Sequence, residues 1–197
     1  MIRLARPDVR FHRSYLAAHV EFGGAHRDGD GDWVEPSDEG GYPGISWTRV
    51  GLEAPAAFER YVRWRLDRAR EDAPRPTGHV PATFFWAFDD REPDTYLGSV
   101  AVRHRLNRAL RELGGHIGYS VRPSARRHGV ATASLRLVLP HAANLGIDPA
   151  LLTCDAENVA SQRVIEANGG VLAEVRGSTR FYWVPTATPV VDPPPIP

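Results

Sequence analysis

The stretch that most constrains the fold of this chain covers residues 116–145. It begins with the strand-like run HIGYSVRP, which ends at Pro123 because proline cannot continue a hydrogen-bonded ladder. The basic loop RRHGVAT follows, and helical spacing then predicts a helix over residues 129–143. Its predicted buried face is formed by Val130, Ala133, Leu137 and Val138. With the strand-like run ALLTCD next in the chain, this order predicts a right-handed crossover between parallel strands that extends to Thr153.

The basic loop has the chemistry of an anion site. A helix N-terminus carries unpaired N–H groups and about half a positive charge. Gly129 lets a ligand approach the backbone, and Arg126 and Arg127 add two cations. Such a site favours a pyrophosphate, with a solvated basic turn as the alternative. A Walker A motif is excluded because all 24 basic residues are arginine, and no G-x-G-x-x-G follows the first strand.

The rest of the chain alternates between strand-like and helix-like patterns. β-Branched and aromatic residues bounded by turn formers predict strands over residues 2–5, 80–90, 95–104, 150–155, 171–175 and 180–184. Apolar residues at helical spacing predict helices over residues 9–22, 55–72 and 158–168, the first with Asp8 as its N-cap. Residues 23–44 are rich in Gly, Asp and Pro and predict a long loop. Pro140 is expected to kink or shorten its helix.

Composition sets the limits of function. The 197 residues predict one mixed α/β domain over residues 1–184, followed by a proline-rich tail over residues 185–197. A formal net charge of zero opposes binding of nucleic acid. With Cys154 as the single cysteine, no disulfide and no cysteine-based zinc site can form, and no metal is expected. No run of 18 apolar residues predicts a membrane span, so we expect a cytoplasmic protein.

Three motifs together resemble one known family. RRHGVA matches the R/Q-x-x-G-x-G/A pyrophosphate motif of the GNAT (Gcn5-related N-acetyltransferase) superfamily. About 30 residues later come ENVAS, with the N-x-x-S pattern, and then NGG, as in that family. The resemblance is firm over residues 116–175 and looser over residues 80–105. It implies the GNAT fold, a central mixed and mostly antiparallel sheet with two splayed parallel strands, flanked by helices.

The resemblance implies acetyl-CoA as the acetyl donor and assigns positions to it. The backbone of Tyr119, Ser120 and Val121 is expected to pair with the pantetheine arm. The pyrophosphate is expected to lie against Arg126, Arg127, His128, Gly129, Val130, Ala131 and Thr132. Asn158 is expected to bond the coenzyme arm from the opposite side, and its alternative role is a helix N-cap. A homodimer is also compatible with the family.

The proton-transfer groups of the family are harder to assign. The position of its usual tyrosine acid is Ile165, and that of its usual glutamate base is Gly115. The nearest titratable candidates are His116, His104 and Tyr119, and a regular hairpin would bring the two histidines together. The alternative for each histidine is a structural hydrogen bond. No Cys/His/Asp triad is evident, so direct transfer is expected.

The acceptor is expected to be a primary amine of a small or amino-acid-like molecule, bound by residues 21–47, Glu53 and the last hairpin. Acidic residues of the long loop would attract a cationic amine, with a solvated loop as the alternative. They are Asp28, Asp30, Asp32, Glu35, Asp38 and Glu39. Two other functions stay open at this point: a protein acetyltransferase acting on an N-terminal or side-chain amine, and a non-catalytic acyl-CoA sensor.

Overall fold

The computed structural model describes residues 1–187, so residues 188–197 of the predicted tail lie outside the described residues. Two antiparallel sheets form the frame. The larger contains β1 (Ile2–Ala5), β4 (Ala82–Asp89), β5 (Gly98–Arg103) and β6 (Ile117–Val121), in the order β1-β4-β5-β6. The smaller contains β7 (Ala150–Asp155), β8 (Val171–Arg176) and β9 (Thr179–Val184), in the order β7-β9-β8. The predicted mixed α/β class is confirmed, with the sheet divided in two.

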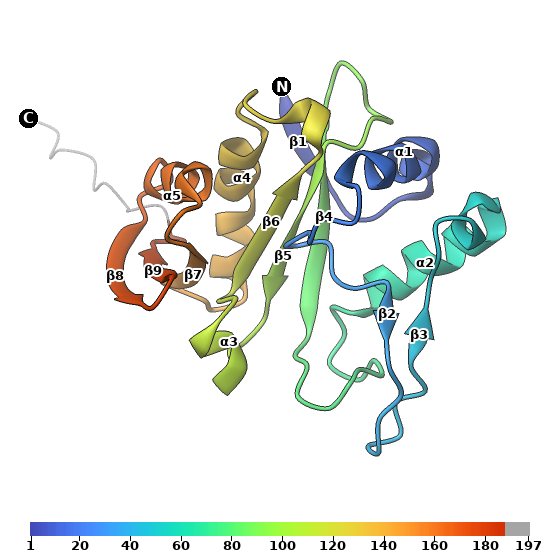
Figure 1. Ribbon diagram of the computed structural model, residues 1–197, viewed down its shortest axis with the longest axis horizontal. Helices are drawn as coiled ribbons and strands as arrows, with labels where there is room; N and C mark the ends of the chain where they lie inside the picture. Colours follow the sequence, from blue (N-terminus) through green and yellow to red (C-terminus); the bar gives the residue numbers. More distant parts are fainter. Residues whose placement is uncertain (188–197) are drawn as a thin grey trace, which may run out of the picture.

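Helices cover both faces of the larger sheet (Figure 1). α4 (Val130–Asn144) lies on one face, and α1 (His12–Phe22) and α2 (Pro55–Asp67) lie on the other. The short α3 (Arg108–Glu112) precedes β6, and α5 (Val159–Glu166) follows β7. Single 3-10 turns form at η1 (Val9–Phe11), η2 (Gly51–Glu53) and η3 (Pro123–Ala125).

The structure differs from the predictions in three local details. Asp8 caps the 3-10 turn η1, where its side chain accepts from the Arg10 N–H, and α1 starts only at His12. Pro140 does not shorten α4, which continues to Asn144. The buried face of α4 also differs from the predicted one: Leu137 is exposed, whereas Leu135 is fully buried. The true buried residues of α4 are Val130, Ser134, Leu135, Val138, Leu139 and Ala142.

The two sheets meet at one point, at the start of β6 and β7. The His116 N–H donates to the Leu151 carbonyl at 2.7 Å, and the Leu151 N–H donates to the His116 ring Nδ1 at 2.9 Å. Beyond this contact the two strands separate, and they border a common cleft. At the point where the sheets diverge, the ring nitrogen of His116 therefore takes the place of a backbone carbonyl as the acceptor for the Leu151 N–H.

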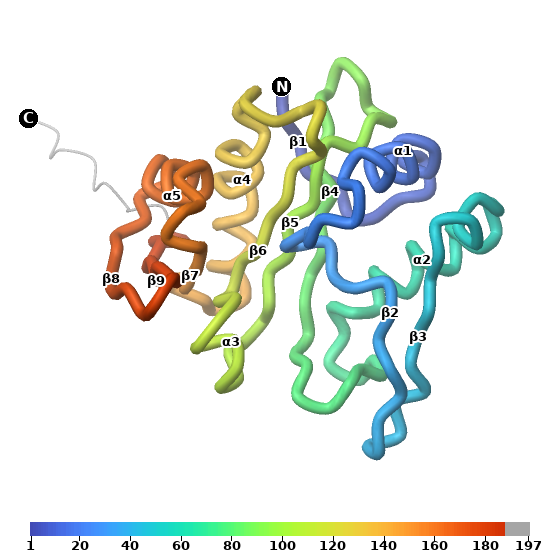
Figure 2. The backbone as a smooth tube through the Cα atoms, in the orientation of Figure 1, coloured from blue at the N-terminus to red at the C-terminus, as the bar shows by residue number. Residues whose placement is uncertain are grey.

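The long loop after α1 is tied to the sheet rather than free in solvent. It contains the two-residue strand β2 (Val34–Glu35), which pairs with β3 (Ile45–Ser46) just beyond it. At Gly29 the loop backbone lies so close to β6 that a Cβ there would overlap the Gly118 carbonyl, so the position requires glycine. Figure 2 shows this segment passing in front of β5 and β6.

Asp30 fixes the same loop in the core. Its carboxylate is fully buried and accepts hydrogen bonds from the hydroxyls of Tyr15 at 2.9 Å and Ser99 at 2.8 Å. The Arg27 guanidinium lies 3.0 Å from the same carboxylate. We call Tyr15, Arg27, Asp30 and Ser99 the Asp30 network. Because every oxygen of the buried charge has a partner, the network holds residues 27–30 against α1 and β5.

None of the helices within residues 1–187 is long and apolar enough to cross a membrane.

Removing the Asp30 carboxylate should destabilise the fold. Asp30→Ala removes the carboxylate that accepts from two buried hydroxyls and pairs with the Arg27 cation, and breaking a buried ion pair in this way costs about 3–5 kcal/mol. Urea unfolding measures the loss. The control is Asp32→Ala, two residues on, which is exposed and should change stability by about 0.5 kcal/mol or less. Equal unfolding midpoints for the two variants would contradict a structural role for Asp30.

Candidate active site

A cleft of about 820 Å³ opens between β6 and β7, where the two sheets diverge. β6 supplies one wall, and β7 with α5 supplies the other. β6 is the edge strand of its sheet, so the edge that does not pair with β5 borders the cleft. The predicted pantetheine residues Tyr119, Ser120 and Val121 all line it.

The basic loop closes the wide end of the cleft. Gly129 is the N-cap of α4 with φ of +75°, and Arg127 has φ of +64°. A left-handed conformation costs a non-glycine residue about 1–2 kcal/mol. Strained residues of this kind cluster at ligand sites, so the conformation of Arg127 is consistent with a binding loop. Six of the seven predicted pyrophosphate residues line the cleft, namely Arg126, Arg127, Gly129, Val130, Ala131 and Thr132. His128 is exposed and is not among them.

Asn158 has the structural role weighed for it, and its position is compatible with the binding role. It is the N-cap of α5, and its Oδ1 accepts from the Ser161 N–H at 3.0 Å. The residue also lines the cleft, with its Nδ2 group left over for a ligand.

Neither of the predicted base histidines lines the cleft. The Nδ1 of His116 accepts from the Leu151 N–H, and burial lowers the pKa of its imidazole to about 4. The ring therefore stays neutral, and its proton sits on Nε2, so neither nitrogen is free to accept a proton without breaking the contact between the sheets. This position does not favour His116 as a base.

His104 turns to a different neighbour. Its Nε2 lies 2.8 Å from the Thr83 hydroxyl on β4, and burial lowers its pKa. The hairpin register pairs Arg103, not His104, with His116 through a 2.8 Å backbone bond. The structure therefore does not bring His104 and His116 together, and His104 has a local structural contact.

Tyr119 spans the cleft. Its hydroxyl lies 2.8 Å from the Ser161 hydroxyl on α5, which joins the two walls. Burial raises the pKa of Tyr119, so the phenol remains protonated at neutral pH. Burial also raises the pKa of Cys154, which is half-buried on β7 in the opposite wall and remains a thiol. Ser161 was missed as a site residue, although the N-x-x-S pattern contains it.

The acidic loop residues divide into two groups. Asp30 and Glu35 are buried in ion pairs with Arg27 and Arg68, and Asp38 accepts backbone hydrogen bonds from Tyr42 and Thr77. The three exposed residues are Asp28, Asp32 and Glu39. Of these, Asp28 lines the cleft and Asp32 lines a neighbouring pocket. Half of the predicted acidic set is therefore structural.

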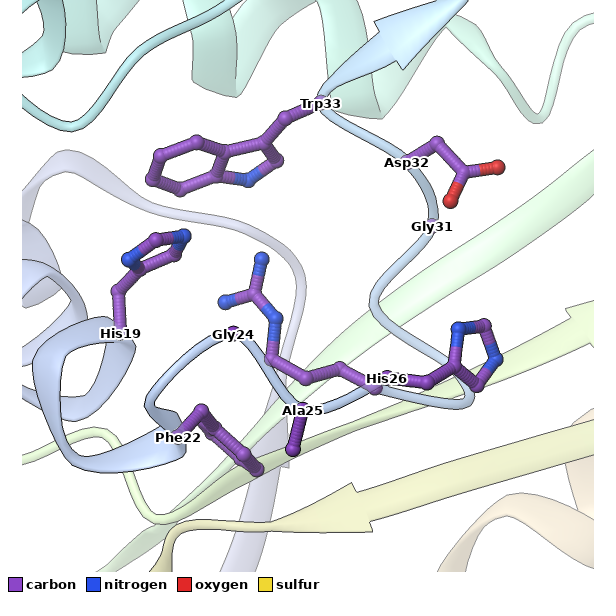
Figure 3. Close-up of a pocket in the computed structure, with 9 residues that line it drawn as sticks. His19, Phe22, Gly24, Ala25, His26, Gly31, Asp32 and Trp33 are labelled. Atoms are coloured by element: carbon purple, nitrogen blue, oxygen red, sulfur yellow. The ribbon is translucent and has the colours of Figure 1, made fainter.

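The neighbouring pocket is small, with a volume of about 230 Å³, and it forms between α1 and the loop that follows (Figure 3). The rings of His19 and Trp33 stack on one side at a centroid distance of 4.0 Å. His26 and Asp32 lie on the other side. Within the described part of the chain, no group of three His, Cys, Asp or Glu side chains is placed to hold a metal ion.

The fold and cleft define a class of protein that binds an acyl-CoA between splayed strands, and comparison with known proteins identifies it. A model of the acetyltransferase (GNAT) domain family matches residues 45–171, more than half of the chain. The chain therefore belongs to the GNAT acetyltransferase family. The predicted fold, enzyme class and acetyl-CoA donor are confirmed at this level, while the acceptor is not resolved.

Solved structures agree on the fold. RimJ from Mycobacterium smegmatis, in complex with CoA-disulfide, is 19% identical with a TM-score of 0.56 over 93% of this chain and 80% of that one. The ribosomal-protein-S5-alanine acetyltransferase of Vibrio fischeri is 13% identical, with a TM-score of 0.57 over 94% and 93%. The Campylobacter jejuni N-acetyltransferase PseH, in complex with acetyl coenzyme A, is 9% identical, with a TM-score of 0.53 over 95% and 100%. No curated protein sequence matches the chain.

The contact at His116 predicts a pH dependence of stability. The folded-state pKa of about 4 lies below the usual 6.5 of an unfolded chain, so the unfolded state binds the proton more readily. The contribution is complete above about pH 6.5 and is lost as the pH falls toward 4. Urea unfolding between these pH values measures the loss.

Two variants separate this titration from the contact itself. His116→Asn keeps an acceptor for the Leu151 N–H without a titrating ring, so its stability should vary less over this pH range. His116→Leu leaves that N–H without its partner, so it should cost about 1–3 kcal/mol above pH 6.5 and, lacking a titrating ring, should also vary less with pH than wild type does. The same pH slope in wild type and His116→Asn would contradict the prediction.

Proposed function

We propose that this acetyltransferase transfers an acetyl group from acetyl-CoA directly to a primary amine of a small or amino-acid-like acceptor. The observation that carries the proposal is the cleft between β6 and β7, which ends at the basic loop before α4. Its size and its lining suit a long, flexible ligand with phosphates at one end. When bound there, acetyl-CoA supplies an acetyl group activated as a thioester.

Different parts of the cleft contact different parts of the donor. The backbone of Tyr119, Ser120 and Val121 offers hydrogen bonds along the free edge of β6. The N–H groups of the first turn of α4, with the guanidinium groups of Arg126 and Arg127, offer donors and positive charge to the pyrophosphate. Arg163 on α5 adds a third cation on the opposite wall.

The hydroxyl pair of Tyr119 and Ser161 is suited to protonate the departing sulfur. Both residues line the cleft, and the 2.8 Å contact between their oxygens lets one hydroxyl pass a proton to the other. The raised pKa of Tyr119 keeps the phenol protonated at neutral pH, so it can donate a hydrogen bond to the sulfur as negative charge develops there. This pair takes the place of the tyrosine acid, whose position is held by the fully buried Ile165.

A negative charge placed in the basic loop should weaken donor binding. Gly129→Glu adds a carboxylate where the pyrophosphate would lie, and it strains a backbone with φ of +75°. We expect isothermal titration calorimetry to show acetyl-CoA binding weakened by about 10-fold or more, equivalent to ~1.4 kcal/mol.

Gly146→Glu is the matched control. Gly146 follows the other end of α4, has φ of +76° and has open space around it, as Gly129 has. Backbone strain alone would lower the stability of both variants equally and leave acetyl-CoA binding unchanged. If Gly129→Glu binds acetyl-CoA as tightly as wild type does, the loop is not the pyrophosphate site.

Loss of the hydroxyl pair should slow transfer without weakening donor binding. We expect Tyr119→Phe and Ser161→Ala each to lower kcat by about 10-fold, at the low end for an acid because thiols ionise near pH 8.5. Because the hydroxyls act as a unit, the double variant should lose little more than either single one. Free-thiol release measures the rate, with the exposed Ser178→Ala as control. Unchanged kcat in both single variants would remove the pair from the reaction.

A further inference from the structure

The donor cleft and the small neighbouring pocket meet at two residues. Phe22 and His26 line both cavities. The pocket holds about 230 Å³, less than the roughly 300 Å³ at which sites for drug-sized ligands begin. His26 is therefore placed where a group bound in the pocket and a donor bound in the cleft would both be near its side chain.

His26 is paired with a carboxylate at this junction. Its Nε2 lies 3.2 Å from Oδ1 of Asp28, which also lines the cleft. Among the residues that line the cleft within the described chain, His26 is the only one with an imidazole. An imidazole oriented by a carboxylate is a common form of general base, because the carboxylate stabilises the cation that forms.

The loop that holds this pair is fixed on both sides. Phe22, buried at the end of α1, precedes His26, and the close approach of Gly29 to the Gly118 backbone follows Asp28. One residue further on, Asp30 is held in its buried network. The pair is therefore exposed to solvent but attached to β6, the strand that borders the donor cleft.

Amide formation requires a base at this point. A primary amine of pKa about 10.4 is protonated at neutral pH, and removing the proton costs roughly 4–5 kcal/mol. Neither His104 nor His116 lines the cleft, and the hydroxyl pair of Tyr119 and Ser161 is suited to give a proton rather than to take one.

We propose that His26, oriented by Asp28, is the general base of the reaction and that the pocket beside it holds the acceptor. This inference rests on the proposed function. The acceptor class is a primary amine attached to a group of about one amino-acid residue in size, either a small molecule or the first residue of a peptide.

The proton balance follows from these positions. His26 takes one proton from the acceptor ammonium group and releases it to solvent. The nitrogen lone pair forms the bond to the acetyl carbon, the carbon–sulfur bond breaks, and the sulfur keeps that electron pair. Tyr119 and Ser161 give a proton to the sulfur, and the second proton lost by the nitrogen restores their hydroxyls. The products are an amide, a free thiol and one proton.

The test uses the full chain with a panel of primary amines: free amino acids, spermidine, and tetrapeptides that begin with Ala or Ser. His26→Asn should lower kcat/KM for thiol release at pH 7 by about 100-fold. Acetyl-CoA affinity, measured by calorimetry, should be unchanged. Asp28→Asn should give a smaller loss, and His79→Asn, an exposed imidazole outside both cavities, should give none.

A pH series separates a base from a structural residue. The loss in His26→Asn should shrink as the pH rises from 7 to 9.5, because more of the acceptor is already neutral. The other ionisable groups lining the two cavities are the same in wild type and variant, so their titration cancels in the ratio. They are His19, Arg27, Asp28, Asp32, Tyr119, Arg126, Arg127, Cys154, Asp155 and Arg163.

The outcomes distinguish the two proposals. A wild type that binds no acetyl-CoA, or releases no thiol with any amine of the panel, overturns the proposed function and this inference with it. A wild type that turns over while His26→Asn keeps its rate, or loses it equally at every pH, overturns the assignment of His26 alone. Acetylation of only those amines whose attached group is too large for the pocket overturns the acceptor class.

Discussion

The two hydrogen bonds between His116 and Leu151 are the constraint on which the rest of the structure depends. They join two antiparallel sheets at one end only, so each sheet keeps its own ladders while the strands beyond the joint separate. The gap becomes a binding cleft because α4 and α5 close it on either side. A backbone pair at this point would continue the sheet, whereas an imidazole satisfies the Leu151 N–H and ends the pairing.

The cleft has different origins on its two sides. The donor side belongs to consecutive elements, from β6 through the basic loop and α4 to β7 and α5. The proposed acceptor side comes from the loop after α1, about 90 residues earlier. The Asp30 network holds this loop against α1 and β5, and Gly29 lies against β6. The buried ion pair with Arg27 thus acts as a positional constraint, since an apolar residue could fill the same space without fixing the loop.

Local patterns were enough to predict the fold and most of the residues that the structure brings together in the cleft proposed to bind the donor. The strand before Pro123, the basic loop and the following helix are contiguous in the chain. Their N–H groups and positive charges are brought together by local backbone conformation, which residues such as Gly129 and Pro123 indicate in the sequence. The part of the site proposed for the acceptor depends on contacts between residues that are distant in the chain. In the sequence, Asp30 has the same Gly-rich surroundings as the solvated acidic residues of the loop. Its partners Tyr15 and Ser99 lie 15 and 69 residues away, so no local pattern indicates them. The same holds for His116, whose partner lies 35 residues away.

Buried and exposed residues alternate along the loop after α1, and substitutions at the two kinds of position have different effects. Gly29 and Asp30 are buried, and Arg27 is paired with Asp30 at the side of the small pocket, whereas His26, Asp28 and Asp32 are exposed and line the cavities. Substitution of the exposed Asp32, which has no part in the proposed proton transfer, leaves the attachment of the loop intact, so the lining of the small pocket can change without loss of folding. In a library built on this scaffold, selection for acceptor preference could act on such positions, while Gly29 and Asp30 are kept for stability.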